Sequence, residues 1–282
     1  MPPREESLKI IDYAICHGID SLDTASKYGN SEALIGEYIE CQCVEKNGTP
    51  PSVITKIPSV HSNNLLTFNE RYQFIEKTIL DSLSRLKLSQ LDCCLLHDPI
   101  DMIAYHGEVV QHLLELKKKH LVKKIGVSIY EPKEVEKVIE LECFDVIQIP
   151  INIFDQRLIR TNLLNKLYKS NIEIYARSIY LQGLLLTPPC ELPDNLKDAK
   201  MYLEHLEVIA KKEGLSIMEI ALLYIRDLPE IVKIIIGCET MEQLIYNLRI
   251  INLPPLTKSI VNEIHDSFQD LPDKIIDPRK WT

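Results

Sequence analysis

Short apolar runs rich in β-branched residues alternate with amphipathic helical stretches along almost all of the 282-residue chain. Most of these runs are apolar throughout, which is typical of parallel strands covered on both faces. The alternation predicts an α/β protein with a parallel sheet, either open and doubly wound or closed as a (β/α)8 barrel. The expected strands are 19–22, 52–57, 92–97, 123–127, 145–150, 172–177 and 232–237. The expected helices are 4–17, 31–41, 69–87, 107–120, 132–141, 160–170 and 200–227 with a break at Gly214, and Ser31–Glu32 and Ser216–Glu219 predict helix starts.

The first residues of the chain bear on the choice between sheet and barrel. A barrel of this type needs eight strands, whereas Pro2-Pro3 followed by Arg4 and two glutamates is typical of a helix start. We therefore expect a TIM-type (β/α)8 barrel lacking its first strand, with seven parallel strands and unpaired edges at 19–22 and 232–237. No linker, internal repeat or low-complexity tract divides the sequence, so residues 1–282 are predicted to form a single domain.

Composition narrows the possible functions. The chain has 32 Lys and Arg against 41 Asp and Glu, a net charge of -9, which argues against a basic nucleic-acid binder. Its apolar stretches fall short of the roughly 20 residues of a membrane span, and its opening sequence has no apolar leader. We expect a cytoplasmic protein without nucleic-acid or membrane partners. The eight cysteines lack C-x-x-C and zinc-ligand spacing, which predicts reduced thiols and no metal site.

Polar residues follow the predicted strands at their carboxyl ends, where barrels of this kind carry their function. Asp23 and then Tyr28 follow the first strand, Lys56 ends the second, and His97 ends the third. Each has an ordinary structural explanation: a loop cap for Asp23, a turn for Tyr28, a solvated end for Lys56 and a core position for His97. Their occurrence together at neighbouring strand ends favours a catalytic cluster.

The sequences around these residues resemble the motifs of the aldo-keto reductase superfamily. LDTASKYGNSE (22–32), VITKI (53–57) and DCCLLHDP (92–99) resemble its aspartate–tyrosine, lysine and histidine segments. KKIGVS (123–128), DVIQIPIN (145–152) and IIIGCETMEQLIYNL (234–248) are similar to its later cofactor-binding segments, in the same order. The resemblance runs from residue 7 to about residue 250 and implies a barrel enzyme that uses a nicotinamide cofactor.

The resemblance implies a role for each member of the cluster in reducing a carbonyl group. The cofactor would supply a hydride, and Tyr28 would give a proton to the carbonyl oxygen as general acid. The ammonium of Lys56 would stabilise the resulting phenolate, and Asp23 would keep Lys56 charged and aimed. His97 would orient the carbonyl group and stabilise its oxygen.

The resemblance also implies a set of cofactor-binding residues: Ser128, Gln148, Asn152, Arg177, Ser178, Gly237, Thr240, Gln243 and Asn247. Ile129 stands where the family usually has an asparagine, and Arg177 replaces a usual tyrosine, whose place over the nicotinamide a planar guanidinium could take. Gly237 and Gln243 stand where some members place Lys and Arg against a 2′-phosphate. The choice between NADP(H) and NAD(H) therefore stays open, with family precedent favouring NADP(H).

Three functions fit these observations. The first is an NAD(P)H-dependent reductase of a small aldehyde or ketone, for instance a sugar-like one, acting as a monomer. The second is a nucleotide-sensing or regulatory subunit of the same family with weak or no turnover, suggested by the missing strand and the altered cofactor contacts. The third is a Schiff-base lyase using Lys56, which leaves Tyr28 unexplained. We expect the first, with substrate choice set by the loops 58–68, 98–106 and 178–199 and by the tail 268–282.

Overall fold

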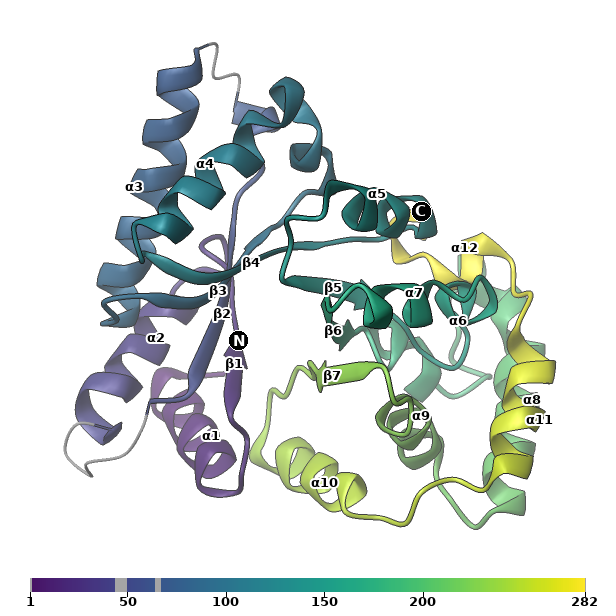
Figure 1. Cartoon of the computed structure of the whole chain (residues 1–282). Coiled ribbons are helices and arrows are strands. Elements are labelled where there is room, and N and C mark those ends of the chain that lie inside the picture. Colours follow the sequence, from purple (N-terminus) through teal and green to yellow (C-terminus); the bar gives the residue numbers. More distant parts are fainter. Residues whose placement is uncertain (1, 44–49, 64–66, 282) are drawn as a thin grey trace. The chain divides into compact units, whose positions relative to one another are not determined.

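The computed structural model of the chain describes residues 2–43, 50–63 and 67–281. They divide into two units, the first comprising Met1–Gln148 and Cys238–Ile245 and the second Ile149–Gly237 and Tyr246–Thr282. Seven parallel strands neighbour one another in the order in which they follow along the chain (Figure 1). The prediction of an α/β chain with seven parallel strands is confirmed, whereas the single domain stays a prediction.

The first unit alternates strands and helices from its start. Within the described residues 2–20 no strand precedes the first helix, as the Pro-Pro start predicts. Helices α1 to α4 alternate with strands β1 to β4 along the chain (Figure 1). The elements are α1 (Arg4–Cys16), β1 (Ser21–Asp23), α2 (Ser31–Tyr38), a short π-helix (Ile39–Cys43), β2 (Ser52–Ile57), α3 (Phe68–Leu86), β3 (Leu91–Leu96), α4 (Glu108–Lys118), β4 (Val122–Ser128), α5 (Pro132–Leu141) and β5 (Val146–Pro150), which continues into the second unit.

The second unit contains the remaining strands and the C-terminal helices. Its elements are α6 (Arg157–Arg160), α7 (Leu163–Lys169), β6 (Glu173–Arg177), α8 (Lys200–Lys212), α9 (Ile217–Arg226), β7 (Ile231–Ile234), α11 (Lys258–Phe268) and α12 (Asp273–Ile276), and α10 (Met241–Ile251) is shared by the two units. The predicted helix 160–170 is interrupted because Asn162 adopts a left-handed conformation, with φ of 56°. The predicted start of α9 is confirmed, since the Ser216 hydroxyl accepts a hydrogen bond from the Glu219 N–H at 3.2 Å.

Strand register aligns the carboxyl ends of the first strands. Leu22 pairs with Val53 across β1 and β2, and Lys56 pairs with Leu95 across β2 and β3. Ser128, the last residue of β4, pairs with Gln148 within β5. Because the carboxyl ends of parallel strands share one edge of the sheet, the predicted catalytic residues of the first unit lie on neighbouring strand ends.

Two glycines allow backbone segments of the first unit to approach closely. A Cβ atom at Gly36 in α2 would lie 1.9 Å from the carbonyl oxygen of Arg85 in α3. A Cβ atom at Gly126 in β4 would lie 2.3 Å from the carbonyl oxygen of Val146 in β5. Neither distance is compatible with a side chain, so both contacts require glycine.

Cys93 and Cys94 lie in the core of the first unit, as their apolar surroundings predict. Their exposed fractions are 2% and 0%. Burial raises the pKa of the Cys94 thiol to about 12, which keeps it protonated at neutral pH. Both therefore behave as small buried hydrophobes.

Candidate active site

Lys56 is the most deeply buried member of the predicted cluster. Its side chain is 2% exposed, and its Nζ donates to Asp23 Oδ2 at 2.7 Å and to the carbonyl oxygen of Thr24 at 2.9 Å. Lysine is almost never buried unless it is paired. The explanation of Lys56 as a solvated strand end is therefore wrong, because β1 holds its ammonium inside the first unit.

Tyr28 lies next to this ammonium, and His97 lies against the Tyr28 ring. Lys56 Nζ is 5.2 Å from the centroid of the Tyr28 ring. The rings of Tyr28 and His97 meet edge to face, with centroids 5.7 Å apart and an interplanar angle of 81°. Tyr28 is 44% exposed, so solvent or a ligand can reach it. The structure thus brings together all four residues predicted to be catalytic, with one aromatic side chain accessible and one cation buried.

A chain of buried polar side chains connects Asp23 to the later strands. Gln148 Nε2 donates to Asp23 Oδ1 at 2.9 Å, and the Ser128 hydroxyl donates to Gln148 Oε1 at 3.3 Å. Gln148 and Ser128 are 1% and 3% exposed. Asp23 therefore holds Lys56 with one carboxylate oxygen and Gln148 with the other. Two predicted cofactor-binding residues belong to the same network as the predicted catalytic residues.

Glu32 is a buried residue of this region that the sequence interpretation assigned to a helix start. Helix α2 begins at Ser31, as predicted, but the Glu32 carboxylate accepts from the Thr55 hydroxyl at 2.6 Å and from Arg85 Nε at 2.7 Å. Glu32 is 2% exposed. It therefore fixes the residue before Lys56 against α3 rather than capping α2. Its position inside the LDTASKYGNSE motif was the available signal.

Three predicted cofactor-binding residues of the second unit lie at or after the ends of β5 and β6: Asn152 follows β5, Arg177 ends β6 and Ser178 follows it. Asn152 Oδ1 accepts from the N–H groups of Phe154 and Asp155, both at 3.0 Å, and its Nδ2 donates to the Ser178 carbonyl oxygen at 3.2 Å. Arg177 donates from Nη1 to the Ser178 hydroxyl at 3.2 Å. The Asn152 amide thus shapes the turn after β5. Contact of these residues with a cofactor stays a prediction.

The remaining predicted residues lie along the chain before and within α10. The Gln243 N–H donates to the Thr240 hydroxyl at 3.2 Å, and Gln243 Oε1 accepts from the Glu239 N–H at 2.8 Å. Within the second unit, the Tyr180 hydroxyl donates to Asn247 Oδ1 at 2.9 Å. Gly237 precedes α10, and a Cβ atom there would meet no atom within 4 Å. These contacts order the predicted loop and leave its contact with a nucleotide a prediction.

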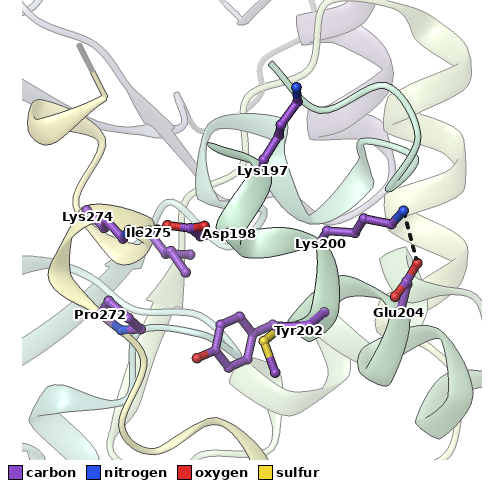
Figure 2. Close-up of a pocket in the computed structure, with 9 residues that line it drawn as sticks. Lys197, Asp198, Lys200, Tyr202, Glu204, Pro272, Lys274 and Ile275 are labelled. Atoms are coloured by element: carbon purple, nitrogen blue, oxygen red, sulfur yellow. Dashed lines mark hydrogen bonds and ion pairs between the residues drawn. The ribbon is translucent and has the colours of Figure 1, made fainter. Parts of the chain in front are cut away.

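A surface cleft of about 460 Å³ lies in the second unit, beside α8 and α12 (Figure 2). Its lysines already face carboxylates: Lys200 lies 3.7 Å from Glu204, and Lys274 pairs with Asp198. Among the described residues that line it, none is a predicted site residue. We assign no ligand to this cleft.

Two further findings apply to the described ranges 2–43, 50–63 and 67–281. No three or more of their His, Cys, Asp and Glu side chains are grouped so that they could hold a metal ion. None of their helices combines the length and the apolar character needed to cross a membrane.

Comparison with known proteins gives consistent matches. The profile of the Aldo/keto reductase family matches residues 2–268. The uncharacterized oxidoreductase YqkF of Bacillus subtilis (strain 168) is 25% identical over 282 aligned positions, which cover 93% of this chain and 87% of that protein. The holo form of aldo-keto reductase AKR11C1 from Bacillus halodurans superposes with a TM-score of 0.73 at 21% identity, over 95% of this chain and 88% of that one. An aldo-keto reductase from Klebsiella pneumoniae in complex with NADPH gives a TM-score of 0.69 at 18% identity, over 98% and 87% of the two chains. The predicted (β/α)8-type fold is confirmed by these structural likenesses.

Proposed function

Since the chain belongs to the Aldo/keto reductase family, a family of oxidoreductases, we propose that it reduces an aldehyde or ketone to an alcohol with a nicotinamide cofactor. One observation carries the proposal. The buried Lys56 ammonium, held by Asp23 at 2.7 Å, lies 5.2 Å from the ring of the accessible Tyr28, which meets His97 edge to face. A phenol between an ammonium and an imidazole is suited to deliver a proton to a carbonyl oxygen.

The bound cofactor supplies the hydride, and the chain's own residues handle the charge that develops on the carbonyl oxygen. Tyr28 gives its hydroxyl proton to that oxygen and becomes a phenolate. The Lys56 ammonium stabilises the phenolate because opposite charges attract strongly at a buried site. His97 donates a hydrogen bond to the same oxygen and orients the carbonyl group. Asp23 does not touch the substrate; it fixes the position of Lys56.

The donor set of the first unit fits a nicotinamide carboxamide. Ser128 ends β4 and Gln148 lies within β5, and their hydroxyl and amide belong to the network that holds Lys56. We place NADP(H) ahead of NAD(H), supported by the NADPH complex of the Klebsiella pneumoniae protein. Gly237 and Gln243 supply no cation for a 2′-phosphate, so we expect a modest preference between the two cofactors.

The proposal is tested by two measurements on the same preparation. Quenching of cofactor fluorescence gives the Kd for NADPH and for NADH. The absorbance of the reduced cofactor then follows turnover with a panel of small aliphatic and sugar-like aldehydes and ketones. We expect binding and turnover of at least one small carbonyl compound. Tight binding without turnover on the whole panel would support the regulatory alternative. Trapping of a substrate on Lys56 by borohydride would support the lyase.

A further inference from the structure

We infer that Asp101 is a positioning residue for the proposed reaction: it joins the loop that follows Lys56 to the loop that follows His97 and so sets the place of the imidazole. This inference rests on the proposed function, since it concerns the residue proposed to orient the carbonyl group. None of the sequence motifs includes Asp101, and it lies in a loop expected only to influence substrate choice.

The carboxylate of Asp101 spans the two loops directly. It is 0% exposed, and its two oxygens accept hydrogen bonds from the backbone N–H groups of Val60 and His61, each at 2.8 Å. Val60 and His61 follow the end of β2, which carries Lys56. Asp101 lies in a short 3-10 turn, Pro99–Met102, shortly after β3 and His97. One buried side chain therefore satisfies two donors of a neighbouring loop, which is a strong and directional connection.

The backbone between His97 and Asp101 is too tightly organised to absorb a displacement. The His97 N–H donates to the Ile57 carbonyl oxygen, at the end of β2, at 3.3 Å. The Asp98 carboxylate then accepts from the Ile100 N–H at 3.1 Å, and the Asp101 N–H donates to the Asp98 carbonyl oxygen at 3.2 Å. His97 is thus held by the sheet on one side and by the Asp101 turn on the other.

The rest of the loop is held in a strained conformation by a second anchor. Tyr105, His106 and Gly107 follow one another with φ of 52°, 56° and 83°, a left-handed run that non-glycine residues rarely adopt. The Arg71 guanidinium covers the Tyr105 ring at 4.1 Å and donates from Nε to Glu108 at 3.0 Å. Such strain persists only where surrounding contacts fix the backbone. The loop after His97 is therefore preset in shape, and Asp101 is its link to the loop after Lys56.

Asp101→Asn tests the inference with little change in shape. It replaces one carboxylate oxygen by an NH₂ group, which cannot accept a hydrogen bond. The NH₂ group must face the backbone N–H of either Val60 or His61, so one of these two hydrogen bonds is lost. The matched control is Asp92→Asn at the other end of the same strand pair. Asp92 in β3 likewise accepts from a backbone N–H that follows the start of β2, that of Val53 at 3.1 Å. Both changes remove one charge and weaken one contact with the β2 segment or the loop after it, but only Asp101 is near His97. Asp92→Asn also removes the ion pair of Asp92 with Lys123 at 2.6 Å, so it is the more severe change at the surface.

We expect Asp101→Asn to lower kcat by about 10-fold to 100-fold, because a shift of about 1 Å in a positioned group has effects of this size. The Kd of Asp101→Asn for the cofactor should stay within about twofold of the wild-type value. Asp92→Asn should keep kcat within about twofold of wild type while lowering Tm about as much as Asp101→Asn does. In the His97→Gln background, Asp101→Asn should cause little further loss, because the two residues act as one unit.

A readout without turnover separates this inference from the proposed function. NMR spectra of the apo protein labelled in its histidine rings, with His97 assigned from His97→Gln, should show its ring signals moved by Asp101→Asn and unmoved by Asp92→Asn. If the wild-type protein reduces no carbonyl compound, the proposed function fails, and these spectra still decide whether Asp101 positions His97. Unmoved His97 signals, or fully additive losses in the double variant, would overturn the inference. If Asp101→Asn does not fold, Asp101→Glu is the second variant, since it keeps the carboxylate but places it one methylene further from the backbone. It must then move the ring signals of His97.

Discussion

Replacing Lys56 by methionine tests whether a buried charge supports the proton transfer by Tyr28. Methionine keeps much of the side-chain length and removes the ammonium. With the charges placed at Nζ and at the Tyr28 ring centroid, 5.2 Å apart, the attraction is about 3 kcal/mol at an effective dielectric constant of about 20. A barrier raised by that amount slows the reaction by about 10²-fold. We therefore expect kcat to fall by about two orders of magnitude with cofactor affinity largely kept.

The same change also affects stability, and the two effects must be separated. Breaking a buried ion pair from one side costs about 3–5 kcal/mol. Asp23 keeps its bond from Gln148 and is 16% exposed, so we expect a value near the lower end. The assay is kcat at saturating cofactor, measured well below the Tm of each variant. Lys117→Met is the control, because it removes the ammonium of another Lys–carboxylate pair of the first unit, with Asp145 at 2.6 Å.

Two results would refute the reasoning. One is a kcat of Lys56→Met within about threefold of wild type, which is below the effect of a general acid that depends on this charge. The other is an equal loss in Lys117→Met, which would show that general destabilisation lowers the rate. In the Tyr28→Phe background, Lys56→Met should cause little further loss of kcat, because the Lys56 ammonium acts on the reaction through the Tyr28 hydroxyl.

Two further predictions concern stability. Gly36→Ala places a Cβ atom against the Arg85 carbonyl oxygen, where 1.9 Å is available, and should lower the free energy of unfolding by about 1–3 kcal/mol; an unchanged Tm would contradict the close α2–α3 contact. His112 is buried against the rings of Phe68 and Tyr72, and burial lowers its pKa below the usual 6.5. As the pH falls, His112 is protonated at a higher pH in the unfolded chain than in the folded one, so stability falls as the pH drops below about 6.5. His112→Leu should therefore lose less Tm on acidification than the wild-type protein. An equal loss in the two proteins would contradict this.

The sequence predicts the strands well because their apolar runs depend on local composition alone. Residues 52–57 are predicted as a strand and form β2 as Ser52–Ile57, and 132–141 form α5 as Pro132–Leu141. Helix ends are predicted less well. The predicted helix 31–41 changes from an α-helix to a π-helix after Tyr38, and a left-handed Asn162 interrupts 160–170. A hydrophobic period continues through such points and does not reveal them.

The cluster of Asp23, Lys56 and His97 could be predicted because parallel strands align their carboxyl ends. The burial of Glu32 and Asp101 is missed, because it depends on partners far along the chain, and of the two only Glu32 lies inside a recognised motif. Glu32 meets Thr55 at a separation of 23 positions, and Asp101 meets Val60 at 41. When the partners of a carboxylate are not known from the sequence, the simplest interpretation is a helix cap or a solvated loop residue.

The most direct test of the proposed chemistry is a single-turnover comparison of wild type and Tyr28→Phe. The change removes the hydroxyl and keeps the ring that packs between Lys56 and His97. With cofactor and carbonyl substrate both saturating, the account predicts that oxidation of the bound cofactor slows by about 10²–10⁴-fold while its Kd stays within about twofold. Oxidation at the wild-type rate in Tyr28→Phe would contradict the assignment of Tyr28 as the proton donor and, with it, the proposed mechanism.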